Sequence, residues 1–171
     1  MDLQRYIRDI PDFPIKGVLF RDITPLLASP EAFAYVIDHL AGRYRGRGLT
    51  RIVGIESRGF IFGGALARAL GMPFVPARKP GKLPYKTIVE SYALEYGEAS
   101  LEVHEDALGK GDRVLLLDDL LATGGTLAAC CRLIERLGGE VVEIATVIEL
   151  AFLKGREKLG GRPYYSMLVY E

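Results

Sequence analysis

Apolar and polar residues follow two alternating periods along this chain, one typical of strands and one typical of helices. Five short apolar runs predict buried strands of a parallel sheet. They lie at 51–56, 73–77, 113–118, 141–148 and 164–170. Apolar residues at helical spacing between these runs predict helices at 59–70, 127–137 and 152–159. Strands that alternate with helices predict an α/β fold with right-handed crossovers.

Other segments lie outside this alternation. Residues 3–9 predict a short helix, and 11–25 a loop-rich segment. Ser29-Pro30-Glu31 predicts a helix start, with an N-cap, a first-turn proline and a first-turn acid. After a polar loop at 78–88, residues 91–96 and 100–104 alternate around Gly97 and predict a hairpin. Because this insertion exceeds an ordinary connection between parallel strands, we expect a lid or a binding loop.

Composition narrows the class of protein. A chain of 171 residues predicts one domain, 1–171. Lys plus Arg equals Asp plus Glu, and this zero formal charge argues against a nucleic-acid partner. Charged residues near Met1 predict no secretory signal, and the longest apolar runs are too short for a membrane span. The adjacent Cys130 and Cys131 lack metal-ligand spacing and favour a reduced, cytoplasmic location, with both thiols buried on a helix.

The strongest candidate for chemistry is the segment 114–126. An aliphatic run leads into Asp118-Asp119, followed by a turn of small residues and the start of a helix. In open α/β sheets, ligands bind beyond the carboxyl ends of the strands. The turn can direct backbone N–H groups, a helix N-terminus and two threonine hydroxyls at a phosphate. The carboxylates can accept hydrogen bonds from sugar hydroxyls, so the segment predicts a site for ribose with its 5′-phosphate.

This segment resembles the 5-phosphoribosyl-1-pyrophosphate (PRPP) motif of the type I phosphoribosyltransferases. The resemblance implies a parallel sheet flanked by helices, with a small hood at about residues 1–30 and a flexible β-hairpin lid at about 79–104. It assigns Asp118 and Asp119 to the ribose. The residues it assigns to the 5′-phosphate are Ala122, Thr123, Gly124, Gly125 and Thr126.

Two further segments offer contacts for pyrophosphate. Ser57 and Arg58 follow a predicted strand and open a helix, so that backbone amides and a guanidinium can meet an anion. The resemblance implies a cis peptide in this loop, which we place at the Ser57–Arg58 bond. The cations Arg78, Lys79 and Lys82 precede the hairpin and are assigned to the same anion. Without the resemblance, the spacing of these three cations is as typical of a solvated loop as of a pyrophosphate site.

Several segments are similar to the adenine branch of this family. They are 13–14 with 17–23, 57–60, 78–79 with 81–84, 94–97, 118–126 and 153–157. The similarity implies that Phe20 stacks on adenine, and that the backbone around Leu19 and Arg21 reads its Watson–Crick edge. It gives Glu95 a catalytic role at adenine N7 and places Tyr96 over the closed site.

The resemblance therefore implies a Mg²⁺-dependent enzyme of purine salvage, a pentosyltransferase, that converts adenine and PRPP into AMP and pyrophosphate. Magnesium is expected to be held mainly by PRPP and water, and the chain is expected to form a homodimer. Two alternatives stay open: the same chemistry on a 6-oxopurine, and a PRPP-binding regulator without catalysis. Phe20-Arg21 and 94–96 favour adenine, and the short segment before Pro11 does not favour a DNA-binding regulator.

Overall fold

The computed structural model describes residues 1–93 and 97–171, which divide into two compact units, Met1–Arg43 and Tyr44–Glu171. The hood predicted for about residues 1–30 falls within the first unit. The expectation of a single domain remains a prediction. No helix in the described ranges is both long and apolar enough to cross a membrane.

The first unit contains an antiparallel pair of strands where a helix and a loop were predicted. A 3-10 helix η1 (Leu3–Tyr6) is capped by the Asp2 side chain, which accepts the Gln4 N–H. Strand β1 (Arg8–Pro11) then pairs with β2 (Leu19–Asp22), and a short helix α1 (Thr24–Ala28) follows. The prediction of a helix over 3–9 was therefore wrong beyond Tyr6. The ladder with β2 satisfies backbone groups that a longer helix would have paired locally.

Helix α2 (Pro30–Tyr44) begins where the sequence predicts. The Ala32 N–H donates to Ser29 Oγ at 3.2 Å, which is the contact of an N-cap. The side chains of Val36 and Leu40 are fully buried, four residues apart on one helical face. The predicted N-cap of this helix and its predicted apolar face are both confirmed.

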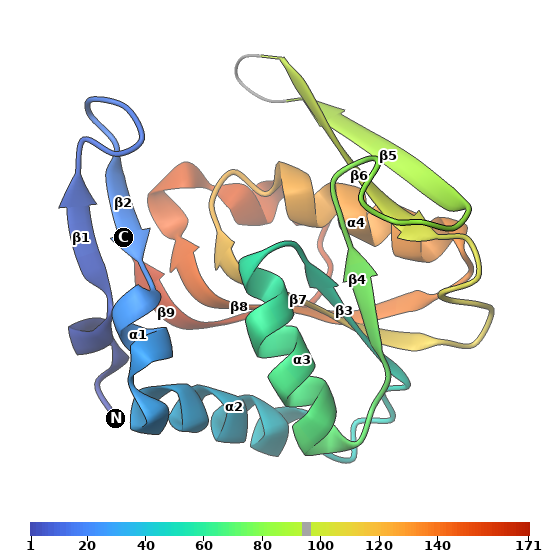
Figure 1. The fold of residues 1–171 in the computed structure, drawn as a ribbon, viewed down its shortest axis with the longest axis horizontal. Helices are drawn as coiled ribbons and strands as arrows, with labels where there is room; N and C mark the ends of the chain where they lie inside the picture. Colours follow the sequence, from blue (N-terminus) through green and yellow to red (C-terminus); the bar gives the residue numbers. More distant parts are fainter. Residues whose placement is uncertain (94–96) are drawn as a thin grey trace. The chain divides into compact units, whose positions relative to one another are not determined.

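The second unit is built on a five-stranded parallel sheet with the order β4-β3-β7-β8-β9. The strands are β3 (Arg51–Ile55), β4 (Phe74–Ala77), β7 (Arg113–Leu121), β8 (Glu140–Leu150) and β9 (Tyr164–Tyr170). Helix α3 (Arg58–Leu70) connects β3 to β4, and α4 (Gly125–Arg136) connects β7 to β8. Because these right-handed crossovers move in opposite directions along the sheet, the helices cover opposite faces (Figure 1).

The predicted hairpin is present as β5 (Thr87–Ala93) paired with β6 (Glu98–His104). It lies beside α4 (Figure 1), where Glu90 accepts from Arg132 and Arg136. Leu101 and Val103 of β6 belong to the same buried cluster as Cys130 and Cys131 of α4. The expectation that both cysteines are free and buried is confirmed.

Two predicted boundaries need correction. Strand β7 extends to Leu121, so the acidic pair lies within the strand, where Asp118 and Leu120 still pair with β8. The helix predicted at 152–159 consists of two 3-10 turns, η2 (Ala151–Leu153) and η3 (Gly155–Leu159). The left-handed backbone of Lys154, with φ of 53°, separates the two turns because a continuous right-handed helix cannot contain it.

Candidate active site

A pocket of about 970 Å³ lies at the carboxyl ends of β3 and β7. Its walls come from the loops after β3 and β4, the hairpin and the loop between β7 and α4. The lining includes most residues that the sequence assigns to PRPP: Ser57, Arg58, Lys79, Lys82, Asp118, Asp119, Ala122, Thr123, Gly124 and Thr126. Segments up to about seventy residues apart thus meet at the edge of a parallel sheet, where ligands bind in open α/β folds.

Two neighbouring carboxylates form the floor of this pocket. Asp119 is buried and Asp118 is half-buried, and the Asp119 N–H donates to Asp118 Oδ1 at 2.8 Å. Burial raises the pKa of Asp118 well above its ordinary value, and the neighbouring Asp119 charge raises it further. Burial also raises the pKa of Asp119, although the Arg58 guanidinium opposes this change. The pocket therefore holds two acids that disfavour simultaneous ionisation.

One oxygen of the pair still lacks a hydrogen bond. Asp119 Oδ2 forms an ion pair with Arg58 Nε at 2.8 Å, but the two groups are not aligned as donor and acceptor. Among the described residues, this buried oxygen has no hydrogen-bond donor. A buried acceptor in this state is costly, so it favours a ligand that brings a hydroxyl or a metal-bound water.

The loop between β7 and α4, which the sequence assigns to the 5′-phosphate, leads through a left-handed glycine into a helix. Gly124 adopts a left-handed conformation with φ of 80° directly before the first residue of α4. The Thr126 hydroxyl donates to Tyr92 Oη at 3.0 Å, which links this loop to the hairpin. Gly125 does not line the pocket; a β-carbon at Gly125 would lie 3.1 Å from the Tyr92 ring. Tyr92 is a pocket residue that the sequence did not indicate.

The loop between β3 and α3 places a cis peptide one bond earlier than predicted. The cis bond joins Glu56 to Ser57, and not Ser57 to Arg58. Ser57 already has right-handed helical angles and Arg58 is the first residue of α3, so the bond between them belongs to the helix start. Ser57 and Arg58, which the sequence assigns to pyrophosphate, both line the pocket.

The three cations after β4 have different surroundings. Lys79 and Lys82 line the pocket, whereas Arg78 does not. Arg78 Nε donates to Glu56 Oε2 at 2.7 Å, and its Nη1 donates to the Lys82 carbonyl at 3.1 Å. Glu56 also accepts the Lys79 N–H. Burial raises the pKa of Glu56, but the bonds from Lys79 and Arg78 outweigh it and the net pKa is lowered.

A second glutamate organises the same loop and was missed at the level of sequence. Glu102 is 4% exposed, and its Oε1 accepts the Lys82 and Leu83 N–H groups at 3.1 and 3.0 Å. Its Oε2 accepts from the Thr87 hydroxyl at 3.2 Å. The only signal in the sequence was an acid between Leu101 and Val103 in a predicted strand.

The remaining predicted residues belong to the first unit or fall outside the described residues. Leu19, Phe20 and Arg21 are on β2 in the first unit, where the Phe20 ring meets Phe13 edge to face at 5.1 Å. Arg21 forms an ion pair with Asp9. Glu95 and Tyr96 are outside the described residues, so their roles stay predictions.

Comparison with known proteins agrees with this geometry. A family model described as "Phosphoribosyl transferase domain" matches residues 23–164. An adenine phosphoribosyltransferase of Roseiflexus sp. (strain RS-1) is 57% identical over 99% of this chain and 98% of its own length.

Solved structures extend the comparison. The adenine phosphoribosyltransferase of Thermoanaerobacter pseudethanolicus superposes with a TM-score of 0.96 at 51% identity, over 99% of this chain and 98% of that one. The Saccharomyces cerevisiae enzyme, complexed with D-2,5-dideoxy-2,5-imino-altritol 1,6-bisphosphate and adenine, has a TM-score of 0.92 at 42% identity, covering 98% and 97%.

Proposed function

The chain belongs to the adenine phosphoribosyltransferases of the phosphoribosyltransferase family, and we propose on that basis that it transfers the 5-phosphoribosyl group of PRPP to adenine. The products are AMP and pyrophosphate, and the reaction serves purine salvage. The observation that carries the proposal is the single pocket in which a carboxylate pair, a phosphate loop and two lysines meet. PRPP presents the matching groups: ribose hydroxyls, a 5′-phosphate and a pyrophosphate.

The acidic pair and the phosphate loop bind the ribose 5-phosphate part. Asp118 and Asp119 accept hydrogen bonds from the ribose hydroxyls, and Asp119 Oδ2 gains a donor that the described residues do not supply. The 5′-phosphate binds to residues 122–126, between the end of β7 and the start of α4. The backbone N–H groups at the start of this twelve-residue helix stabilise the dianion.

The cationic wall stabilises the leaving group. During transfer, the bond from ribose C1 to pyrophosphate oxygen breaks, and pyrophosphate departs with the electron pair. Ser57, Arg58, Lys79 and Lys82 line the pocket where this charge develops. Arg78 contributes by fixing the Lys82 backbone through its carbonyl. Preorganised cations at a developing negative charge are an effective source of rate enhancement.

Magnesium fits the same region. The unsatisfied carboxylate oxygen of Asp119 and the neighbouring Asp118 suit a hydrated cation. When bound, Mg²⁺ neutralises phosphate charge and makes pyrophosphate a better leaving group. In our proposal PRPP and water supply most of its ligands, and the acidic pair orients the sugar beside it.

Adenine recognition is assigned to residues of β2 and of the hairpin. Phe20 stacks on the base, while the backbone at Leu19 and Arg21 reads its exocyclic amine and ring nitrogens. The Glu95 carboxyl group hydrogen-bonds adenine N7 and helps to remove the proton that the base loses as N9 forms the new bond to ribose C1, and Tyr96 covers the site. The hairpin acts as the lid that excludes water, since water would hydrolyse the activated sugar.

The proposal includes a homodimeric enzyme located in the cytoplasm. Two free cysteines at neighbouring buried positions support a reducing compartment. The homodimer rests on the family resemblance, and sedimentation of the purified protein tests it.

Pyrophosphate release with each purine in turn tests the function. Purified protein is incubated with PRPP, Mg²⁺ and adenine, hypoxanthine, guanine or xanthine. Rapid release with adenine, together with AMP, is the expected result. Release only with a 6-oxopurine contradicts the assignment of the base. PRPP binding without release for any base indicates a regulator instead of an enzyme.

A further inference from the structure

The segment 153–157 belongs to the sequence similarity, but the chemistry above gives it no role. It comes after β8 and runs from the last residue of η2 into the first residues of η3. Gly155 is buried although its neighbours Lys154 and Arg156 are exposed. A buried glycine between two exposed cations indicates that the backbone itself makes a close contact there.

That contact is with the phosphate loop. A β-carbon at Gly155 would lie 2.2 Å from the Ala122 carbonyl oxygen and 2.8 Å from Leu121 Cδ1. In the opposite direction, a β-carbon at Gly124 would lie 2.3 Å from the Gly155 carbonyl oxygen. The two backbones therefore touch without intervening side chains. A side chain added at Gly155 must therefore displace Ala122, the first residue of the loop, or shift Gly155 itself.

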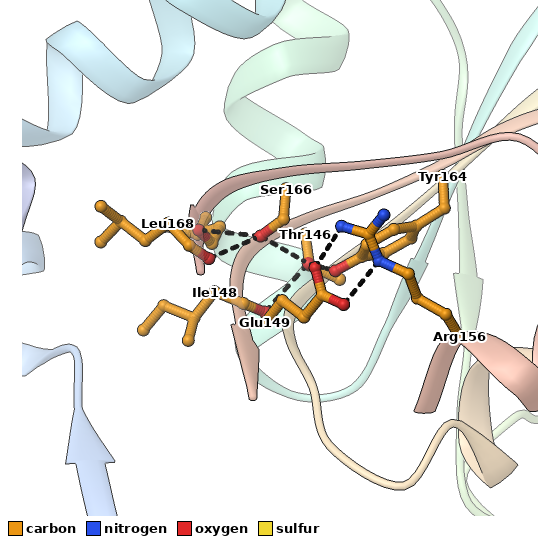
Figure 2. A network of polar contacts seen from close by, with 8 residues as sticks. Thr146, Ile148, Glu149, Arg156, Tyr164, Ser166 and Leu168 are labelled. Carbon is orange, nitrogen blue, oxygen red and sulfur yellow. Dashed lines mark hydrogen bonds and ion pairs between the residues drawn. The ribbon is translucent and has the colours of Figure 1, made fainter. Parts of the chain in front are cut away.

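A polar anchor fixes the position of Gly155. The neighbouring Arg156 donates from Nε and Nη2 to the two carboxylate oxygens of Glu149, each at 2.5 Å, and Glu149 is 3% exposed. Figure 2 shows the guanidinium beside the Tyr164 ring, 4.8 Å from its centroid. The Tyr164 hydroxyl in turn bonds the buried Thr146 hydroxyl at 2.6 Å. On the other side, Leu159 lies in the main core cluster.

We propose that Gly155 is a positioning residue for the 5′-phosphate loop and that the Glu149–Arg156 pair holds it in place. The inference rests on the proposed function, because it assumes that residues 122–126 bind phosphate. Gly155 touches no substrate. Its backbone supports the side of the loop formed by Ala122 and Gly124, and so fixes the direction of the N–H groups that meet the 5′-phosphate.

The test compares ligands with and without the phosphate. Binding of AMP, ribose 5-phosphate and adenine to the full chain is measured by calorimetry for the wild type and Gly155→Ala. The backbone angle of Gly155 is not in the left-handed region, so alanine introduces a steric change only. The matched control is Gly109→Ala, where a β-carbon meets nothing within 4 Å.

We expect Gly155→Ala to weaken the binding of AMP and of ribose 5-phosphate about tenfold or more, which corresponds to the loss of one charge-assisted hydrogen bond. The affinity for adenine should change less than about twofold. Unchanged AMP affinity in the folded variant contradicts the proposal. An equal loss of affinity for all three ligands also contradicts the proposal, because a general loosening of the fold would weaken ligands with and without a phosphate alike. A wild type that binds neither phosphate ligand counts against the proposed function instead.

A second variant decides the question if Gly155→Ala does not fold. Arg156→Lys keeps the positive charge near Glu149 but cannot form the two-fold contact or stack equally well on Tyr164. We expect Arg156→Lys, like Gly155→Ala, to weaken the binding of ribose 5-phosphate, here about threefold or more. The affinity for adenine should not change. Full affinity for ribose 5-phosphate in this variant overturns the proposal.

Discussion

Asp118 and Asp119 are arranged for a ligand and not for stability. Burial raises the pKa of both, and Asp119 Oδ2 lacks a hydrogen-bond donor among the described residues. A fold selected for stability alone would place neutral or apolar residues here. At the scale of single residues, the acidic pair therefore costs stability, in keeping with the trade between stability and function seen in active sites.

Asp118→Asn tests this interpretation through stability. The folded pKa of Asp118 lies above its ordinary value of 3.8, so the ionised carboxylate destabilises the fold at every pH above the folded pKa. We expect the variant to raise Tm at pH 7.5 by about 2 °C or more, roughly 1 kcal/mol for a domain of this size. The difference in Tm between the variant and the wild type should shrink as the pH falls. The variant should also lose activity.

The control for this experiment is Asp106→Asn, an exposed carboxylate in the turn after β6. Calorimetric scans at pH 7.5, 5.5 and 4 compare both variants with the wild type. An Asp118→Asn protein less stable than the wild type at pH 7.5 is incompatible with our account of the acidic pair.

Glu95 is predicted to act in the chemical step. Removing its carboxylate in Glu95→Ala leaves adenine N7 without a partner as N9 reacts, so kcat should fall by about 100-fold or more. The KM for PRPP should change little. Steady-state kinetics with both substrates separate the two effects, and near-normal turnover removes Glu95 from catalysis.

At the scale of elements, Glu102 connects strand β6 to the cationic loop. Its carboxylate accepts two backbone N–H groups at Lys82 and Leu83, and the pocket-lining side chain of Lys82 depends on that loop. One buried acid therefore positions a cation that carries the opposite charge. Glu102 thus holds the loop, whereas Lys82 lines the pocket.

Glu102→Gln should loosen this loop and raise the KM for PRPP about threefold to tenfold, because a charge-assisted acceptor becomes a neutral one. It should also lower the free energy of unfolding by about 1–3 kcal/mol at neutral pH. Burial raises the pKa of Glu102, but the backbone bonds outweigh it and the net pKa is lowered. Its contribution is therefore complete above the ordinary value of 4.5 and is lost as pH falls through the folded pKa.

Unfolding followed at pH 7, 5 and 3.5 measures this dependence. The exposed Glu105→Gln in the adjoining turn serves as the control. If the difference between Glu102→Gln and the wild type stays constant over this range, the carboxylate does not hold the loop as described.

The sequence predicted the elements whose pattern is dictated by burial. Strand β3, buried at four of its five residues, begins at the predicted Arg51, and α2 has its predicted cap at Ser29. Strand β9 has the predicted bounds, but none of its residues is buried, so the prediction of a buried strand there was wrong. The pair β1–β2 was missed because each strand is only four residues long and β1 is mostly exposed, which leaves no alternating apolar signal.

The site was predictable where a contiguous motif carries it. The acidic pair and the phosphate loop are adjacent in sequence and line the pocket together. Glu56, Glu102 and Tyr92 were missed because their roles depend on partners 20 or more residues away, such as Arg78, Lys82 and Thr126. Pairing at that range is set by the tertiary fold, which local periodicity does not encode.

For the whole molecule, the two thiols on α4 report on opening of the fold. Cys130 is fully buried with a raised pKa, and burial raises the pKa of Cys131 to about 12. Because the thiolate is the reactive form, neither should react in the folded protein at neutral pH. We expect labelling by an aromatic disulfide reagent to follow unfolding, and AMP at about 100 times its Kd to slow labelling about 100-fold. Rapid labelling that AMP does not affect contradicts this prediction.

The position of β7 in the sheet also has a kinetic consequence. Its first residues meet the start of β3 across 63 residues of chain, where the Thr50 hydroxyl accepts the Arg113 N–H. Parallel pairing over such a separation folds slowly, on the order of milliseconds to seconds, since the intervening chain loses entropy before the contact forms. During synthesis β3 can pair with β4 long before β7 leaves the ribosome. The pocket, whose floor belongs to β7, is then among the last parts of this unit to take shape.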